Sequence, residues 1–177
     1  MKILRAVALL LALATSGCIL ISGQVLVTYD LPDITVPSPL ALVPIQIDLN
    51  TVSDYTDHKS NLKGVADEAL VGLVKNDKGA PLSVQVWITP EETNYLSVNQ
   101  VTANGILVWG PLNLAANEQR RVDWDASAAL ITKAGRAALE REVKGDGKFT
   151  VYVVGTGADF GFTVTEGKFL AIINAGV

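Results

Sequence analysis

Residues 69–90 read ALVGLVKNDKGAPLSVQVWITP and decide the fold class of the chain. Two apolar runs flank NDKGAP, in which Asn, Asp and Gly suit a tight reversal of the backbone. In the second run Val84, Val86 and Ile88 share one strand face and alternate with Gln85, which is the period of a strand with one buried face. The stretch therefore predicts two antiparallel strands joined as a hairpin.

Similar short apolar runs recur on both sides of this stretch. Residues 24–31, 45–50 and 106–116 are such runs, and residues 148–176 supply two or three more, separated by GTGAD and TEG. Four prolines in residues 32–44 indicate an extended connection at a sheet edge. Roughly seven to nine strands with a turn signal about every ten residues predict an all-β fold, an antiparallel β-sandwich of immunoglobulin-like type.

One segment breaks the strand pattern. Residues 125–144, DASAALITKAGRAALEREVK, are rich in helix formers, so we expect one helical insertion around residues 126–144. Asp125 or Ser127 can cap its start. Because Gly135 interrupts the segment, it can form either one helix or two short helices.

The N-terminus carries a leader. Lys2 and Arg5 precede the apolar core AVALLLALA, and the small residues TSG come directly before Cys18, the one cysteine of the 177 residues. This arrangement resembles the signal peptide of bacterial lipoproteins. The resemblance implies diacylglycerol on the Cys18 thiol, cleavage before Cys18, and acylation of the new amino group. A thiolate is a suitable nucleophile for such a transfer.

The resemblance implies three parts: a signal peptide (1–17), a lipidated N-terminus with a short tether (18–23), and the β-sandwich domain (24–177). Two other interpretations stay open. Ordinary secretory cleavage would leave Gly17 as the first residue with a free thiol nearby. Alternatively, residues 6–21 stay as an uncleaved helix, although this run is shorter than the roughly 20 residues that span a bilayer. In all three interpretations the domain is exported across the membrane.

Charge and cysteine content limit the kinds of partner that the chain can bind and the ways in which its fold can be stabilised. The leader holds two of the 14 basic residues and none of the 18 acidic ones, which leaves a net charge of −6 from Cys18 onward. This balance argues against nucleic acid as a partner. A single cysteine excludes an internal disulfide, so packing must stabilise the fold.

The chain offers little catalytic chemistry. His58 is its one histidine, and no G-x-S-x-G motif occurs. Asp54, Asp57 and His58 lie close together in a polar loop, but a metal site needs a more ordered set of ligands. The alternate acids of VDWDAS resemble the start of a calcium loop, yet the turn glycine and the last glutamate are missing. We therefore expect no enzyme, no catalytic residue, no metal site and no cofactor.

The aromatic residues are the candidate binding groups. Trp87 lies on the strand face that it shares with polar residues, where it can stack on a sugar or anchor a protein, unless the helical insertion or a loop covers it. Tyr55 and Tyr95 lie in polar loops and can extend such a surface. Trp109 and Trp124 are expected in the core, Trp124 on a strand.

These observations favour a lipid-anchored protein of the cell envelope with a non-catalytic binding or structural role. Its expected partners are the membrane, through the N-terminal lipid, and an envelope protein or glycan. In the lipoprotein family an Asp after the cysteine favours the inner membrane; Ile19 stands there, which favours the outer membrane in a Gram-negative cell. The alternatives are an exported carbohydrate- or protein-binding module using Trp87 and the loop tyrosines, and an exported hydrolase using acidic residues.

Overall fold

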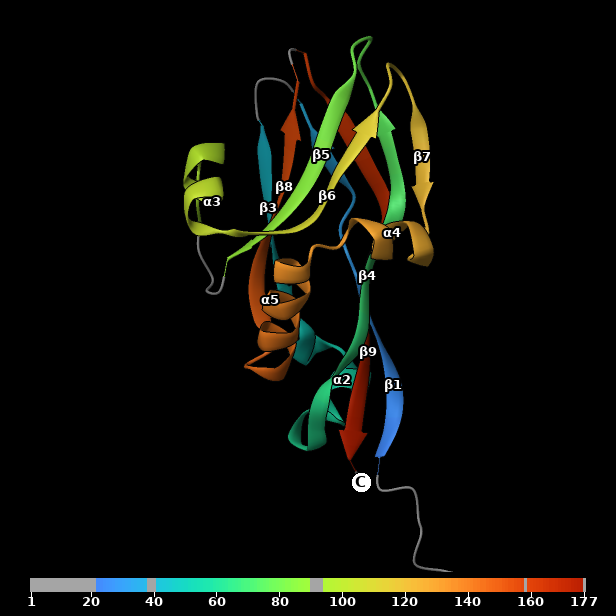
Figure 1. Ribbon diagram of the computed structural model, residues 1–177, viewed down its shortest axis with the longest axis vertical. Coiled ribbons are helices and arrows are strands. Elements are labelled where there is room, and N and C mark those ends of the chain that lie inside the picture. The colour runs from blue at the N-terminus through green and yellow to red at the C-terminus, as the bar shows by residue number, and fades with distance from the viewer. Residues whose placement is uncertain (1–21, 38–40, 90–93, 158, 177) are drawn as a thin grey trace, which may run out of the picture.

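The computed structural model describes residues 22–37, 41–89, 94–157 and 159–176. They form two antiparallel β-sheets packed face to face (Figure 1), so the predicted β-sandwich is confirmed. The five-stranded sheet has the order β1-β9-β4-β7, and β2 also pairs with β9. The four-stranded sheet has the order β3-β8-β5-β6. The strands are β1 (Ser22–Asp30), β2 (Ile34–Val36), β3 (Leu42–Asp48), β4 (Leu62–Asn76), β5 (Leu82–Thr89), β6 (Ile106–Leu114), β7 (Gln119–Val122), β8 (Lys148–Thr156) and β9 (Phe162–Gly176).

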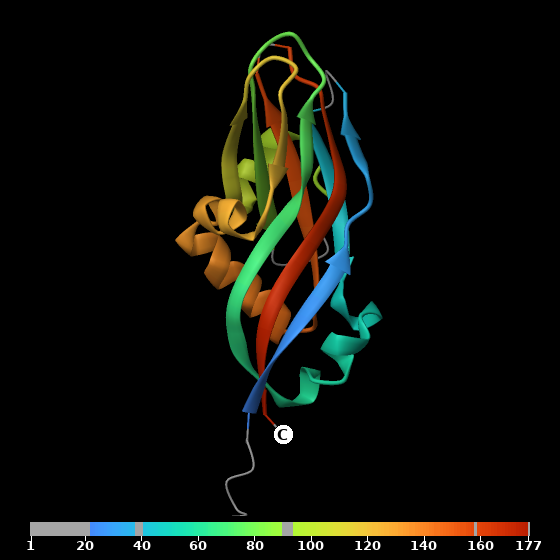
Figure 2. The same ribbon diagram turned by 90° about the vertical axis from the view of Figure 1, so that its right-hand side faces the viewer.

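Two long strands run through the molecule from end to end. β4 and β9 have 15 residues each and pair with one another, and β1 pairs with the second half of β9 from Ser22–Gly176 to Asp30–Lys168. Both described chain ends therefore meet at one end of the molecule, which is the lower end in Figures 1 and 2. We call it the terminal end.

The predicted hairpin of residues 69–90 is wrong. Its two strands, β4 and β5, are consecutive in sequence but belong to different sheets, so the connection crosses from one sheet to the other. Asn76 holds this crossing: its buried side chain donates to the carbonyls of Ala80 (2.8 Å) and Ala115 (2.7 Å) and accepts from the amide of Lys78. Apolar residues alternate in both strands because the inner faces of β4 and β5 pack against the same core.

Helical segments are more numerous than the single expected insertion. The insertion is two helices, α4 (Trp124–Leu130) and α5 (Lys133–Lys144), and the described residues also contain α2 (Ser53–Thr56), α3 (Val98–Asn104) and the short 3-10 helices η1 (Leu49–Thr51) and η2 (Lys59–Asn61). Asp123 caps α4 and Thr132 caps α5, so the break lies before Gly135. Gly135 is needed for close packing instead, because a Cβ there would lie 2.4 Å from Val108 Cα.

Helices α4 and α5 pack against β4 and β6, one strand from each sheet, and so cover one side of the sandwich. The core between the sheets is mostly aliphatic, with Phe149 and Phe169 in edge-to-face contact at 5.9 Å. None of the described helices is long and apolar enough to cross a membrane.

Candidate functional site

The predicted lipid-attachment residue, Cys18, lies outside the described residues. Ser22 is the first residue that the structure describes, and it is already paired with Gly176 in the five-stranded sheet. Strand β1 thus begins two residues earlier than the sequence predicts, and the sheet starts four positions after Cys18.

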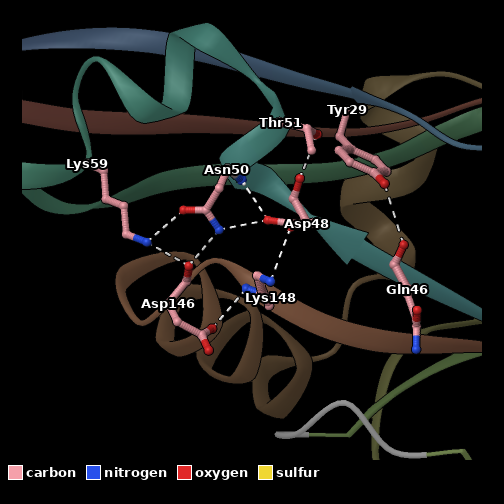
Figure 3. A network of polar contacts seen from close by, with 8 residues as sticks. All are labelled: Tyr29, Gln46, Asp48, Asn50, Thr51, Lys59, Asp146 and Lys148. Atoms are coloured by element: carbon pink, nitrogen blue, oxygen red, sulfur yellow. Dashed lines mark hydrogen bonds and ion pairs between the residues drawn. The ribbon is translucent and has the colours of Figure 1, made fainter.

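A network of polar contacts braces the molecule near the terminal end (Figure 3). Lys59 of η2 donates to Asn50 Oδ1 (2.8 Å) and to the carbonyl of Asp146 (2.7 Å), in the turn between α5 and β8. Asn50 in turn donates to Asp48 Oδ1 (2.7 Å), and Lys148 lies 3.4 Å from the same carboxylate. The hydrogen bonds from Asn50 hold the pKa of Asp48 below its ordinary value. These contacts tie the segment between β3 and β4 to the turn before β8.

Tyr55 lies inside this brace and not in a surface loop. Its side chain is fully buried, and its hydroxyl donates to the carbonyl of Val143 at 2.8 Å. Burial raises the pKa of the Tyr55 hydroxyl. The ring fills the space beside Gly147, where a Cβ would lie 2.6 Å from the Tyr55 oxygen. Tyr55 therefore anchors α2 to α5 and is not available to a ligand at the surface.

The nearby acids and histidine do not form a cluster. His58 Nδ1 lies 2.9 Å from the carbonyl of Asp54, and within the described residues no group of three His, Cys, Asp or Glu side chains is placed to hold a metal ion.

Trp87 and Tyr95 do come together. They pack with Val98 and Val101 of α3 and with buried Tyr152 of β8 on the outer face of the four-stranded sheet. The Tyr95 and Tyr152 rings are 6.0 Å apart, and the Tyr95 amide donates to the Tyr152 hydroxyl at 2.9 Å.

Trp87 is half-buried in this group, and its indole N–H donates to Gln85 at 3.1 Å. The element that covers this face is α3 and not the insertion around residues 126–144. Leu96, beside Tyr95, is 80% exposed; no sequence pattern marked it, because the residues around it show neither strand nor helix periodicity.

The structure reveals a charged cluster that the sequence did not indicate. Arg136 of α5 reaches β4 and contacts Asp67 and Glu68, with Arg136 Nη1 2.9 Å from Glu68 Oε2. The Glu68 side chain is only 1% exposed, and this burial raises its pKa to about 7 against the opposing pull of Arg136. Partial burial acts to raise the pKa of Asp67, but hydrogen bonds from Arg136 and Trp124 hold it below its ordinary value.

The same region holds the two remaining tryptophans. Trp124 begins α4 and is half-buried, donating to Asp67 at 3.1 Å, so its expected place on a core strand is wrong. The cause is Asp123, which caps the helix by accepting from the amide of Ala126. Trp109 is buried as expected, and its indole donates to Ser127 at 3.2 Å.

No protein-family model matches this chain, and no curated protein is detectably similar to it in sequence.

Proposed function

We propose that this chain is an exported protein of the cell envelope, anchored to a membrane by lipid on Cys18, with a non-catalytic binding or structural role. The outer membrane is the proposed location in a Gram-negative cell. The immunoglobulin-like type of the sandwich belongs to the same proposal.

The observation that carries the proposal is the position of β1. Fully extended, the chain from Cys18 to Ser22 reaches at most about 14 Å, and from Ser22 onward it pairs residue by residue with β9. An acylated Cys18 would therefore hold the sheet next to the bilayer, with the terminal end and its braced 3-10 segments facing the lipid. Such an attachment suits a domain that works at the membrane surface better than one that needs a long reach.

The charged cluster supports a non-catalytic role. A hydrolase using two carboxylates needs groups that face the substrate. Asp67 and Glu68 both contact Arg136, and Asp67 also accepts from Trp124. These partners contact both carboxylate oxygens of Asp67 and Oε2 of Glu68, and they join α5 and α4 to β4. We assign the cluster to the stability of the fold.

The anchor is tested by mass spectrometry of the chain extracted from membranes. We expect an N-terminal Cys18 carrying diacylglycerol and an amide-linked acyl chain. Cys18→Ser should remove both and prevent maturation, whereas Ser16→Ala keeps a small residue before the cysteine and should leave acylation intact. A mature chain that starts at Gly17 with a free thiol, or one that keeps residues 1–17, would disprove the proposal.

The use of Trp87 and Tyr95 by a sugar or protein ligand stays a prediction. Gln85, α3 and Tyr152 already account for the position of Trp87, and Tyr55 does not extend that surface. Loss of ligand retention in Trp87→Ala, with an unchanged melting temperature, would favour this binding role.

A further inference from the structure

Strand β1 lies at the edge of the five-stranded sheet, and one side of its backbone has no strand beside it. Among the described strands it pairs with β9 alone, without a register shift. Leu31 continues this ladder, because its amide donates to the carbonyl of Gly167 at 2.9 Å. Alternate residues of an antiparallel strand direct both backbone groups to the same side. Gln24, Leu26 and Thr28 therefore direct their N–H and C=O groups away from β9, at what we call the free edge.

The other edge strands carry features that prevent pairing with a further strand. β3 and β6 contain Pro44 and Pro111, which have no N–H, and α4 and α5 pack against β6. β2 has three residues, and β7 has four, two of which are Arg120 and Arg121. Short strands, prolines, charges and covering helices are the usual protections of a sheet edge. β1 has nine residues with no proline and no charge before Asp30, so among the described strands its edge is the one most open to another strand.

An apolar contact is available beside the free edge. Leu26 stands at the centre of β1 and next to buried Val27, so its side chain lies on the outer face of the sheet. It is 50% exposed, and it pairs with Ile172 of β9, which is half-buried on the same face. A strand added at the free edge would place a side chain directly against Leu26.

Helix α2 lies on the inner side of the same edge. It contacts β1, and Tyr55 of α2 belongs to the same core as Val27 of β1. Figure 2 shows this teal segment beside β1. The inner-facing side chains of an added strand would therefore lie near α2.

Acidic side chains surround the free edge. Asp54 of α2 and Asp57, which follows it, are exposed, as is Asp33 in the turn after β1. These three carboxylates form no ion pair with another described residue. Asp30 is 77% exposed and is paired with Lys168. The charge around the edge has the same sign as the net charge of the domain and favours a basic partner.

We propose that the free edge of β1 binds an extended strand of a basic partner protein, which adds a strand to the five-stranded sheet. The free backbone groups of β1 recur about every 6.8 Å, which is two residues of a strand, and the backbone of another strand matches this spacing. Apolar side chains of the partner contact Leu26, and the alternate basic side chains face Asp54 and Asp57.

This inference names a class of partner for the proposed binding role. It does not depend on the anchor, because the free edge belongs to the folded domain. A failure of the experiment below would leave acylation of Cys18 to its own test, and a chain without acyl groups would leave the edge intact.

The test uses NMR of the isotope-labelled full chain in maltoside micelles. The probe is a capped peptide of alternating valine and lysine, nine residues long like β1, and the control peptide carries glutamate in place of lysine. With the lysine peptide we expect saturable shifts of the Gln24, Leu26 and Thr28 amides and several-fold slower hydrogen exchange, because these amides gain acceptors. The Val25 and Val27 amides face β9 and should keep their exchange rates. The glutamate peptide should bind several-fold more weakly.

Two exposed leucines provide a matched pair of variants. Leu26→Lys places a charge at the free edge and should abolish binding of the lysine peptide, whereas Leu96→Lys changes the 80% exposed leucine beside Tyr95 and should leave binding intact. Leu26→Pro removes an N–H that no strand of the fold uses, and it should have the same effect as Leu26→Lys. The melting temperature of each variant shows whether the fold is kept.

The acidic residues are tested by a double variant. Asp54→Asn with Asp57→Asn should weaken the lysine peptide several-fold and reduce the salt dependence of its binding.

Four results would overturn the inference. They are equal binding of the two peptides, shifts spread over the acidic surface without slower exchange in β1, binding that persists in folded Leu26→Lys, and protection of the Leu26 amide that rises with the concentration of the chain alone. The last result would assign the free edge to a second copy of the chain.

Discussion

At the scale of single residues, Glu68 is the most unusual group of the fold. It is a buried carboxylate with one charged partner, and its pKa is raised to about 7. In the unfolded chain the same carboxyl ionises near 4.5. Between these two pH values the native state binds more protons than the unfolded state, so the free energy of unfolding falls as the pH rises.

We predict that Glu68→Gln removes this pH dependence. From pH 5 to pH 8 the parent chain should lose roughly 2–3 kcal/mol of unfolding free energy relative to the variant, which is most of the free energy equivalent to the pKa shift. Urea denaturation at several pH values measures the difference. Glu166→Gln, at a side chain that is 60% exposed and paired with Arg121, is the control and should keep the parental slope. An unchanged slope in Glu68→Gln would disprove the prediction.

At the scale of elements, one hydroxyl fixes α4 to both sheets. Ser127 is fully buried, and its Oγ accepts from the amide of Leu70 on β4 (2.8 Å) and from the indole of Trp109 on β6 (3.2 Å). A buried donor that loses its partner keeps its full desolvation cost. Ser127 therefore contributes more to the stability of the fold than the size of its side chain suggests.

We predict that Ser127→Ala lowers the free energy of unfolding by about 2–4 kcal/mol, because two buried donors lose their acceptor at once. Chemical denaturation followed by tryptophan fluorescence measures this change. Ser60→Ala, at an exposed position of η2, should change stability by less than about 0.5 kcal/mol. Equal effects of the two substitutions would show that Ser127 does not hold the helix.

The elements also show what the sequence could predict. Strand positions followed from alternation, since Val84, Val86 and Ile88 must bury one face wherever β5 lies. Sheet membership did not follow, because β4 and β5 have the same local pattern whether they pair or cross between sheets. Their actual partners are distant in sequence, as Ser22 and Gly176 illustrate.

The candidate site was predictable only in part. Trp87 and Tyr95 were singled out and do meet, since strand parity places Trp87 outside the core. Tyr55 is surrounded in sequence by polar residues, and only the fold reveals that its ring is buried against α5. The contact between Glu68 and Arg136 joins residues 68 positions apart, and no local pattern predicts such a contact. Helix α3 was missed because VNQVTAN has just two apolar valines.

At the scale of the whole molecule, stability is unevenly distributed among the strands. β9 is paired on both sides in its second half, with β1 and β4, and it buries Phe169, Ala171 and Ile173. β7 has four residues and pairs with β4 alone among the described strands.

We predict that the slowest amide hydrogen exchange occurs in β9 between residues 169 and 173, with protection close to the free energy of global unfolding. Amides of β7 should exchange through local opening and much faster. Exchange measured by NMR tests this difference. Equal protection of β7 and β9 would show that the sandwich opens only as a unit.

The pairing of β1 with β9 also has a mechanical consequence. Under the proposed anchoring at Cys18, a load between the membrane and the far end of the molecule would run along β1, parallel to the strand. Nine paired positions of β1 and β9 would then share the load at once, in shear. A load between the two chain ends would instead peel β1 from β9 one pair at a time. The same strand is therefore strong against pulling from the far end and weak against pulling at the C-terminus.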